Sequence, residues 1–446
     1  MKWLVLAAVA LLLQACGGGG GGSSAVAPAD PPVADASACP VADQRASLRS
    51  FMGDQYFWYA NLAAPDENAT SMDAYFQSML YRPTDRYSFT QPSAAFNQVF
   101  TDGRRIGYGY TTVWADAAHT IMRIRNVEPR SPVAQAGLAR GDIVVSIDGY
   151  TPQAIAGGQA GPVTEAGIDR TFVVRNAAGV QRVLRVQSAD YPLTPVVDVT
   201  TFDAMRGGAP VKVGYLAYNQ FVQYSSFDLY NAFVQFAAAG AGELILDLRY
   251  NGGGSVAVSR DLASMIGGDR TGDLLYAYLR FNDKNAGMNS SVAFNNSVPG
   301  GMAFPLPGGM PRLIVIGSGS TASASELIIN GLRPFMPVVL VGETTYGKPY
   351  GFIPRGNCGT IYNAVQFTSV NSLNQGNYDH GFPPDCAVAD DLDHQLGDPA
   401  EARIHAALGY IETGRCPAAP QAAATGAPLQ PSPVFGDTVP PQMFTD

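Results

Sequence analysis

The sequence predicts a multidomain α/β protein with a small helical N-terminal unit, a β-rich domain and an α/β core. Apolar and aromatic residues recur at helical spacing between Ala46 and Met79, with a break at Ala64-Pro65. Short β-rich runs separated by turns fill residues 104–190. From about Val211 onward, strand-like and helix-like runs alternate. This alternation is typical of a parallel or mixed sheet covered by helices.

The two ends of the chain are expected to lie outside the folded part. Residues 1–15 carry one Lys and an apolar stretch that is too short for a membrane span, as in an export signal. The following LQAC resembles a bacterial lipobox, which implies cleavage before Cys16 and acylation of its thiol. The alternative is an ordinary signal peptide with a chance Cys. Residues 16–38 are expected to form a flexible linker, and the Pro/Ala-rich residues 416–446 a disordered tail.

Composition argues against nucleic acid as a partner and against a bound metal. The net charge is −9, with only 28 Lys and Arg residues, and no basic patch is interleaved with aromatics. No Cys or His pair has ligand spacing, so we expect neither a metal nor another cofactor.

Apart from Cys16, the chain has four cysteines, which is an even number. Because the chain is expected to reach an oxidising compartment, two disulfides are favoured. Three pairings are possible. We favour Cys358–Cys386 together with Cys39–Cys416, the second joining the two ends of the folded part. The alternative is four buried free thiols.

The predicted units are a helical domain at residues 39–100, a β-rich domain at 101–190 and the core at 191–415. Within the core, the apolar patterns predict the following elements in order: a strand at 214–221, a helix from Phe227 to Ala239, a strand at 243–249, a helix after Ser255, a strand in LIVIGSG, a helix from Ala324 to Leu332 and a strand at 338–343.

Two blocks of the β-rich region together resemble a PDZ domain. They are IGYGY (106–110) and MRIRNVEPRSPVAQAGLARGDIVVSIDG (122–149). A PDZ domain binds an extended peptide by strand addition, and backbone N–H groups of a loop hold the terminal carboxylate. The resemblance makes Gly107, Tyr108, Gly109 and Tyr110 the candidate peptide-binding loop, in which glycine lets the backbone approach the ligand closely.

Three loops with unusual composition follow predicted core strands, where reactive groups of α/β proteins gather. DLRYNGGGS (247–255) offers backbone N–H groups near a helix N-terminus, suited to an oxyanion. A phosphate loop is the competing interpretation, but no GK[ST] follows. STASASEL (320–327) places serines at a strand-to-helix turn, although some hydroxyls there are expected only to cap the helix; Ser325 is the candidate for that role.

The third loop, GETTYGK (342–348), contains a lysine that could activate a serine. A serine is a weak nucleophile unless a base takes its proton. A desolvated lysine can lose enough basicity to serve as that base. The strand, helix and next strand would bring the two loops side by side, although spacing alone does not establish contact.

The set of PDZ-like module, DLRYNGGG, STASASEL, GETTYGK and HGFPPD (380–385) resembles the C-terminal processing proteases, also called tail-specific proteases, over roughly residues 104–412. These are serine/lysine peptidases with an embedded PDZ domain. The resemblance implies that Ser323 is the nucleophile and Lys348 the base. It also implies oxyanion donors at Ala324 and at Gly253 or, as second choice, Gly254.

The chain departs from the family pattern near the lysine. Pro334 stands where family members often carry an acidic residue, and Phe352 where they often carry Gln. Another residue must therefore orient Lys348; Tyr346 and Glu326 are the candidates. A pairing of serine with His380 is the less favoured alternative, since that histidine more naturally belongs to a turn.

The resemblance implies an exported, lipid-anchored serine endopeptidase on the periplasmic side of a bacterial envelope membrane, the outer membrane being favoured. It would cleave proteins or peptides near exposed C-termini, which the PDZ-like domain would recognise. One alternative is a catalytically weak or inactive peptide-binding lipoprotein on the same fold, and another is an esterase. The sequence predicts neither the substrate nor the oligomeric state.

Overall fold

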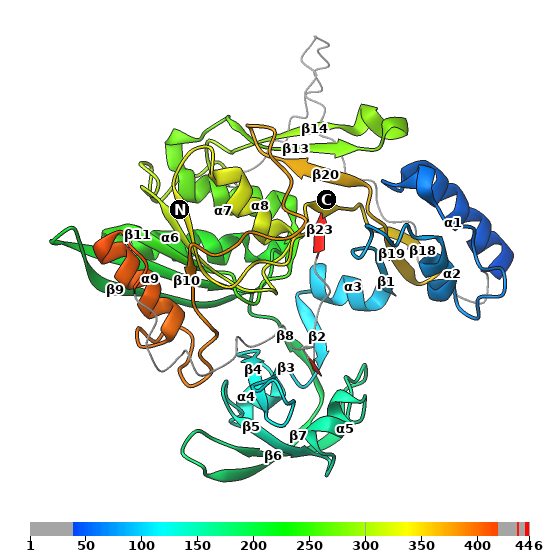
Figure 1. Cartoon of the computed structure of the whole chain (residues 1–446), viewed down its shortest axis with the longest axis horizontal. Coiled ribbons are helices and arrows are strands. Elements are labelled where there is room, and N and C mark those ends of the chain that lie inside the picture. Colours follow the sequence, from blue (N-terminus) through cyan, green and yellow to red (C-terminus); the bar gives the residue numbers. More distant parts are fainter. Residues whose placement is uncertain (1–38, 299, 418–434, 437–441, 446) are drawn as a thin grey trace, which may run out of the picture.

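The computed structural model describes residues 39–298, 300–417, 435–436 and 442–445. The expected export signal, Cys16 and the whole linker at residues 16–38 therefore lie outside the described residues. Figure 1 shows the α/β core with the β-rich region below it and the N-terminal helices at one side. None of the helices in the described part of the chain is long and apolar enough to cross a membrane.

The core is built on a six-stranded sheet in the order β21-β16-β15-β11-β10-β9. All neighbours are parallel except β9, which is antiparallel to β10. The strands are β9 (Val196–Arg206), β10 (Ala209–Tyr218), β11 (Ala241–Asp247), β15 (Leu313–Gly317), β16 (Val338–Gly342) and β21 (Cys386–Ala387). This mixed sheet confirms the predicted α/β fold class.

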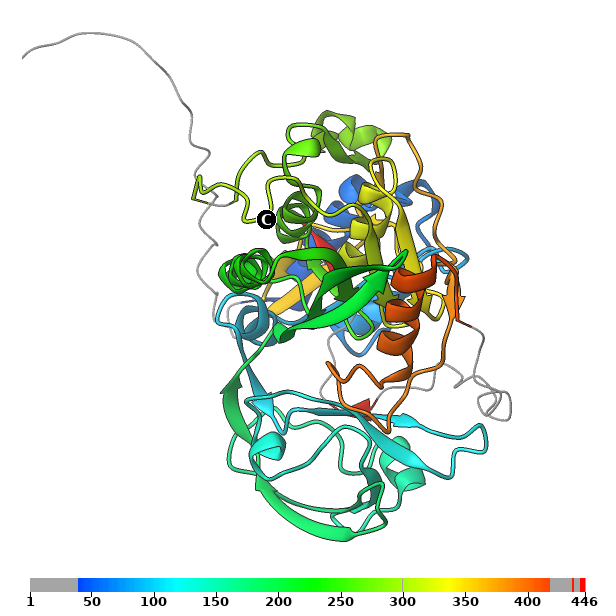
Figure 2. The same cartoon turned by 90° about the vertical axis from the view of Figure 1, so that its left-hand side faces the viewer.

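Helices cover both faces of this sheet, as the side view in Figure 2 shows. They are α6 (Ser226–Ala239), α7 (Val256–Gly267) and α8 (Ala324–Leu332), with α9 (Ala402–Thr413) on the opposite face. In β15, Leu313 and Val315 pack in the cluster with the first three helices, whereas Ile314 and Ile316 pack in the cluster with α9. A strand buried on both faces needs a continuous apolar run, which is why LIVIG contains no polar residue.

A second sheet, in the order β14-β13-β20-β17, packs beside α7 and α8. Its strands are β13 (Leu275–Phe281), β14 (Ser290–Ala293), β17 (Tyr350–Gly351) and β20 (Phe367–Val370). Three short 3₁₀ helices complete the core: η3 (Gln223–Ser225), η4 (Gly268–Arg270) and η5 (Asp283–Met288).

The β-rich region has its own apolar core and two sheets, β2-β8 and β22-β3-β4-β5-β6-β7, in which β22 (Phe435–Gly436) comes from the C-terminal tail. Its elements are β2 (Arg104–Gly107), β3 (Tyr110–Trp114), β4 (Met122–Val127), α4 (Pro132–Gln135), β5 (Ile143–Ile147), α5 (Pro152–Ala156), β6 (Asp169–Arg175), β7 (Gln181–Gln187) and β8 (Ala189–Pro192). Its assignment as a PDZ domain stays a prediction.

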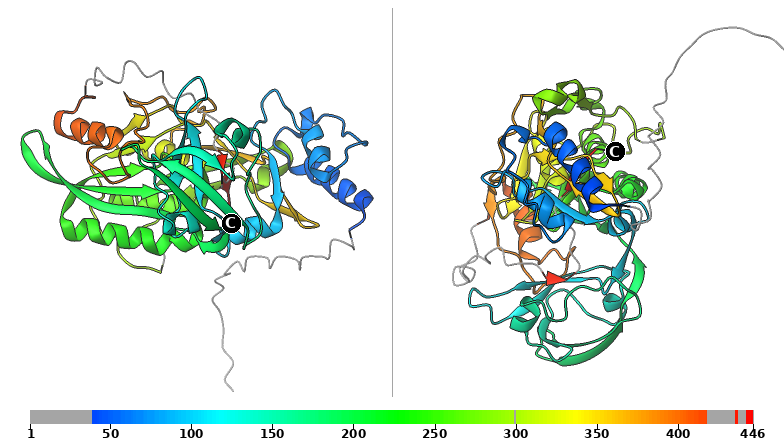
Figure 3. Two further views of the ribbon diagram at one scale, coloured as in Figure 1. Left: turned by 90° about the horizontal axis from the view of Figure 1, so that it is seen from below. Right: turned by 90° about the vertical axis from the view of Figure 1, so that its right-hand side faces the viewer.

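The N-terminal unit shares its core with a distant hairpin. The unit comprises α1 (Val41–Gln55), η2 (Tyr59–Asn61), α2 (Met72–Met79), β1 (Phe89–Pro92) and α3 (Ser93–Phe100). The hairpin is formed by β18 (Arg355–Asn357) and β19 (Thr360–Asn363), and β1 pairs with β19. Tyr362 and Val365 lie in the same buried cluster as Phe51 and Phe76. The views in Figure 3 show this unit against one end of the core.

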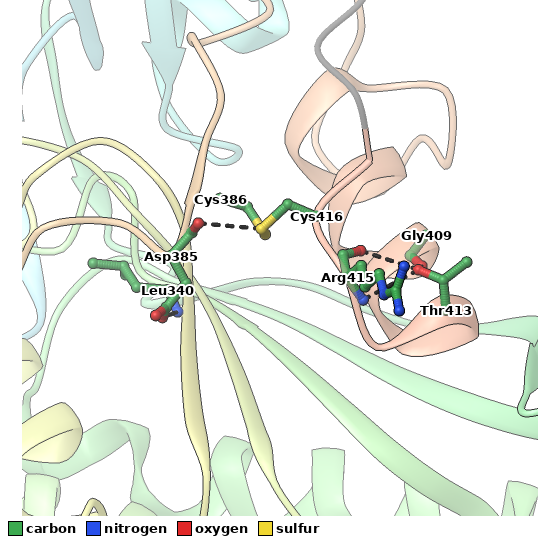
Figure 4. The surroundings of a disulfide bond; sticks show 7 residues. All are labelled: Leu340, Asp385, Cys386, Gly409, Thr413, Arg415 and Cys416. Atoms are coloured by element: carbon green, nitrogen blue, oxygen red, sulfur yellow. Dashed lines mark hydrogen bonds between the residues drawn. A yellow bond between two sulfur atoms is a disulfide. The ribbon is translucent and has the colours of Figure 1, made fainter.

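Two disulfides are present, but the favoured pairing was wrong: Cys39 bonds to Cys358 and Cys386 bonds to Cys416. Cys358 lies in the β18–β19 turn, beside the N-terminal unit that begins at Cys39. Cys416 follows α9, which packs against β16, the neighbour of the strand that holds Cys386. Figure 4 shows this second bond, where the Cys416 sulfur also contacts the Asp385 carbonyl oxygen. Tertiary packing therefore decides the pairing.

Parts of the tail that the sequence predicts to be disordered form regular structure, and most of its other residues lie outside the described part of the chain. Two short strands belong to the tail, β22 (Phe435–Gly436) and β23 (Gln442–Phe444). The first pairs with β3, and the second, labelled in Figure 1, pairs with β12 (Gly253–Ser255) in the core.

Candidate active site

The three predicted loops emerge at one edge of the core sheet. They follow β11, β15 and β16, and these strands are parallel neighbours. Their carboxyl ends therefore lie side by side, as the sequence predicts for an α/β layer.

Most hydroxyls of the serine-rich loop fasten it to the glycine-rich loop. The Ser318 and Thr321 hydroxyls donate to backbone carbonyls of residues 249 and 248, at 2.5 and 2.7 Å. The Ser325 hydroxyl donates to the Asn251 carbonyl at 3.0 Å. These side chains satisfy buried backbone groups, so Ser325 has a structural role. It does not cap the helix as expected, because Ser323 is the N-cap residue of α8 and Ser325 lies within the first turn.

Ser323 differs from its neighbours in both backbone and side chain. It is fully buried, and its backbone has φ 64° and ψ −116°, a region that non-glycine residues rarely enter. Among the described residues its Oγ has no hydrogen-bond partner. A strained backbone at the turn from β15 into α8, with an unsatisfied buried hydroxyl, is typical of a nucleophile.

Glu326, in the first turn of α8, joins the serine loop to the lysine loop. Its Oε2 accepts the backbone N–H groups of Ser323 at 2.9 Å and Lys348 at 2.8 Å. Its Oε1 accepts the Thr345 hydroxyl at 2.5 Å and the Gly347 N–H at 2.7 Å. Burial raises the pKa of Glu326, and these four hydrogen bonds oppose that increase by stabilising the carboxylate.

Lys348 is buried in an apolar environment. Its Nζ lies 4.8 Å from the ring centre of Phe352 and 5.9 Å from that of Phe89. Burial lowers the pKa of Lys348 to about 7, although the charges of Asp85 and Glu326 favour the ammonium form. A substantial fraction of this amine is therefore unprotonated at neutral pH. Phe352, which replaces the polar residue common in the family, contributes to this dry environment.

Two residues are candidates for orienting Lys348. Glu326 holds the backbone of Lys348 by accepting its N–H group. Tyr346 uses its own N–H to bind the Thr321 carbonyl at 2.9 Å, which fastens the lysine loop to the serine loop.

The N-terminal unit supports the lysine loop, a role that the sequence analysis missed. Arg86 Nη2 donates to the carbonyls of Tyr346, Gly347 and Asp379 at 3.0, 3.2 and 2.9 Å. The Tyr87 hydroxyl also donates to the Gly347 carbonyl, at 2.9 Å. No local pattern predicts contacts between residues about 260 positions apart.

Of the two candidate oxyanion donors in the glycine-rich loop, we take Gly254, the second choice from the sequence, as the proposed donor. The Gly253 N–H already donates to Asn251 Oδ1 at 2.8 Å. Gly254 has φ 140°, and a Cβ there would lie 2.0 Å from the Phe221 carbonyl oxygen, so only glycine fits. Ala324 is the first residue of α8, and the N–H of a first helical residue has no partner within its own helix.

The structure separates His380 from the serine. Its side chain is 96% exposed, whereas Ser323 is fully buried. The turn that contains it packs on the lysine loop instead, since the Phe382 N–H donates to the Thr345 hydroxyl at 2.8 Å. The preference for a turn residue over a catalytic histidine is consistent with this position.

The candidate peptide-binding loop of the β-rich region has buried side chains. Tyr108 and Tyr110 pack in the core of that region, and the Tyr108 hydroxyl donates to the Ile168 carbonyl at 3.0 Å. Gly107 and Gly109 have φ 154° and 89°. A Cβ at position 109 would lie 1.9 Å from the Ser131 Cβ, so packing within the domain already requires glycine there. Any peptide binding by this loop would depend on its backbone.

Comparison with known proteins shows that the core is similar to peptidases of family S41. Residues 212–354 match the profile described as Peptidase family S41. A crystal structure of a candidate S41 protease from Bacteroides fragilis is 26% identical, covers 82% of this chain and 96% of that one, and has a TM-score of 0.66. The photosystem II D1 C-terminal processing protease, at 20% identity and a TM-score of 0.50, shares the fold.

Among curated proteins, the chain is similar to C-terminal processing peptidases. The chloroplastic enzyme of Tetradesmus obliquus is 26% identical over 315 residues, covering 67% of this chain and 64% of that protein. The carboxyl-terminal-processing protease of Synechocystis is 29% identical over 302 residues, covering 64% of this chain and 63% of that protein. The chain thus spans somewhat less than two thirds of the length of these relatives.

Proposed function

We propose that the protein is a serine-type endopeptidase that cleaves polypeptides near their C-termini, with Ser323 as nucleophile and Lys348 as general base. The observation that carries this proposal is the shared Glu326 carboxylate. It fixes the backbones of both residues, while the Ser323 hydroxyl is buried without a partner among the described residues and the Lys348 pKa is lowered to about 7.

In the proposed mechanism, unprotonated Lys348 takes the proton of the Ser323 hydroxyl as the oxygen attacks a peptide carbonyl. The N–H groups of Ala324 and Gly254 stabilise the resulting oxyanion, each contributing about 3 kcal/mol. The lysine ammonium then protonates the leaving amine. Water, activated by the same amine, hydrolyses the acyl-enzyme and regenerates the serine.

The β-rich region is proposed to present substrate tails to this site as a PDZ domain does. Its contacts with the core support a coupled arrangement. Arg125, on β4, donates to the Ser320 hydroxyl of the serine loop at 2.9 Å. Arg140 forms a buried ion pair with Asp390 of the core, at 2.9 Å. A change in the β-rich region on peptide binding would therefore be transmitted to the serine loop through the contact of Arg125 with Ser320.

The cellular setting is proposed from the sequence alone. An export signal followed by acylated Cys16 would place the enzyme on the periplasmic side of a bacterial envelope membrane, with envelope proteins or peptides as substrates. The two disulfides are consistent with an oxidising compartment.

The test is cleavage of an unstructured polypeptide by the purified chain. We expect cleavage by the unaltered protein and its loss in Ser323→Ala and in Lys348→Ala, with both variants retaining the fold by circular dichroism. His380→Ala is the matched control and should cleave normally. Cleavage by folded Lys348→Ala would refute the dyad. Turnover of small activated esters without peptide cleavage would favour the esterase alternative, and peptide binding without any turnover would favour a binding lipoprotein.

A further inference from the structure

A segment of the chain's own tail lies against the candidate oxyanion loop. Strand β23 pairs in parallel with β12, so that Gln442, Met443 and Phe444 lie opposite Gly253, Gly254 and Ser255. Gly254 is the glycine proposed as an oxyanion donor. An extended segment paired with this loop lies where a substrate strand must approach the site.

The same segment is buried against apolar residues next to the candidate base, and the place it occupies is called the groove below. Met443 is fully buried and Phe444 is 6% exposed. The Phe352 N–H donates to the Met443 carbonyl at 2.9 Å, and Phe352 is the residue whose ring lies 4.8 Å from Lys348 Nζ. The Phe444 ring packs edge-on against Phe100 with a centroid distance of 5.1 Å. The groove therefore accepts two consecutive large apolar side chains.

A second part of the tail lies on the β-rich region. Phe435 and Gly436 of β22 pair antiparallel with Thr112 and Thr111 of β3. Strand β3 directly follows the candidate peptide-binding loop, and β22 is the outermost strand of that sheet. Addition of an extended segment to a sheet edge is the way in which PDZ domains hold peptides. Both surfaces expected to bind substrate thus carry strands of the same tail.

We propose that β22 and β23 are a tethered peptide ligand that substrates must displace from the β3 edge and from the groove beside β12. The groove accordingly selects extended segments with an unbranched apolar residue followed by an aromatic one, as in Met443-Phe444. This inference rests on the proposed function in taking the groove as the substrate site. Its binding test does not require that the protein cleave anything.

Because the tail is part of the same chain, it competes strongly with a free peptide for these surfaces. A segment linked to its site acts at an effective concentration of about 1 mM, so even a weak ligand occupies the site most of the time. For a segment whose intrinsic Kd is about 0.1 mM, a competing peptide would bind about tenfold more weakly to the full chain than to a chain without the tail.

The test measures the binding of a fluorescent PQMFTD peptide, the sequence of residues 441–446, in the Ser323→Ala background. A chain ending at Val434 should bind this peptide at least about tenfold more tightly than the full chain. Phe444→Ala in the full chain should also strengthen binding, because it weakens the tethered competitor. Phe227→Ala removes an aromatic ring that is 66% exposed on α6 and is the matched control; it should leave binding unchanged.

Equal affinity for the full chain and the truncated chain would overturn the inference. If the truncated chain does not fold, the Phe444→Ala variant decides the question. Tighter peptide binding by this variant than by the full chain with Phe444 intact supports the inference, and unchanged binding overturns it. Cleavage assays then separate the two proposals. One outcome would be that peptide binding depends on the tail while the protein with Ser323 intact cleaves no polypeptide. This outcome would contradict the proposed function and still support the tethered ligand.

Discussion

The backbone N–H groups of Ser323 and Lys348 donate to one and the same carboxylate oxygen, Oε2 of Glu326, at 2.9 and 2.8 Å. Two residues on separate loops are thereby held at a fixed separation that does not depend on their side-chain rotamers. Catalytic groups need such fixed placement, because small errors in position cost much of the rate. Glu326 is therefore proposed to be the residue that positions the dyad.

Glu326→Gln should reduce kcat/KM about 100-fold or more and lower the free energy of unfolding by about 2–4 kcal/mol. The carboxylate accepts four hydrogen bonds, two on each oxygen. An amide offers one oxygen, and its NH₂ group would face two of the same donors. Peptide cleavage and denaturant unfolding measure the two effects.

Glu343→Gln is the control for that substitution. Glu343 lies in the same loop, but its side chain is 34% exposed and pairs with Arg403 at 3.2 Å. We expect little change in either quantity. An active, stable Glu326→Gln protein would show that the carboxylate does not position the two loops.

The rate of cleavage should fall below about pH 7 and reach a plateau above it. Lys348 acts in its unprotonated form, and burial lowers its pKa to about 7, so acid converts it to an inactive ammonium. The measurement is kcat/KM for an uncharged peptide between pH 5 and 9. Lys348→Arg keeps a long cationic side chain but cannot lose its proton. It should therefore be inactive throughout this range, and activity that rises with pH in this variant would assign the titration to another group.

The same buried amine should destabilise the fold in a pH-dependent way. Between the folded pKa of about 7 and the ordinary lysine pKa of 10.5, the unfolded chain binds a proton that the folded chain does not. The free energy of unfolding therefore rises with pH across this window, by about 1.4 kcal/mol per pH unit from this group.

Lys348→Met should remove this contribution. We expect the variant to be more stable than the unaltered protein by a few kcal/mol near pH 7, a gain that shrinks toward zero near pH 10. Urea unfolding at several pH values measures it. A gain independent of pH would mean that the lysine is not buried in its neutral form.

The sequence predicts the local part of this site well. Each loop follows a strand with a continuous apolar pattern, and parallel neighbours must carry their loops on one edge. The three loops and the candidate base Lys348 could therefore be selected before any coordinates were known, whereas the choice of Ser323 among the hydroxyls rests on the family resemblance. The start of α8 at Ala324 also agrees with its pattern, because a helix with a serine and a glutamate in its first turn has a strong local signal.

Contacts between distant segments could not be predicted in this way. Arg86 supports the lysine loop from a unit whose sequence shows only helical periodicity. Strand β23 has a composition that predicts disorder, and it is ordered by pairing with β12 and burying Met443. The disulfide pairing likewise follows from the packing of α9 and of the β18–β19 hairpin. Such features depend on tertiary structure that one sequence does not encode locally.

Peptide mapping without reduction should yield two linked pairs, Cys39 with Cys358 and Cys386 with Cys416. A Cys358–Cys386 peptide would contradict the fold around the N-terminal unit. Both bonds are expected to stabilise the protein, because each closes a chain loop in the unfolded state, and removal of either should cost about 2–5 kcal/mol.

Only the first of these bonds is expected to affect catalysis. The double variant Cys39→Ser/Cys358→Ser loosens the unit that carries Arg86 and Tyr87, and these residues hold the Gly347 carbonyl next to the candidate base. We expect its kcat to fall about tenfold at a temperature where it remains folded. Cys386→Ser/Cys416→Ser is the matched control, since that bond joins β21 to the end of α9 and should change stability alone. Equal kcat losses in the two double variants would show that the N-terminal unit does not position the lysine loop.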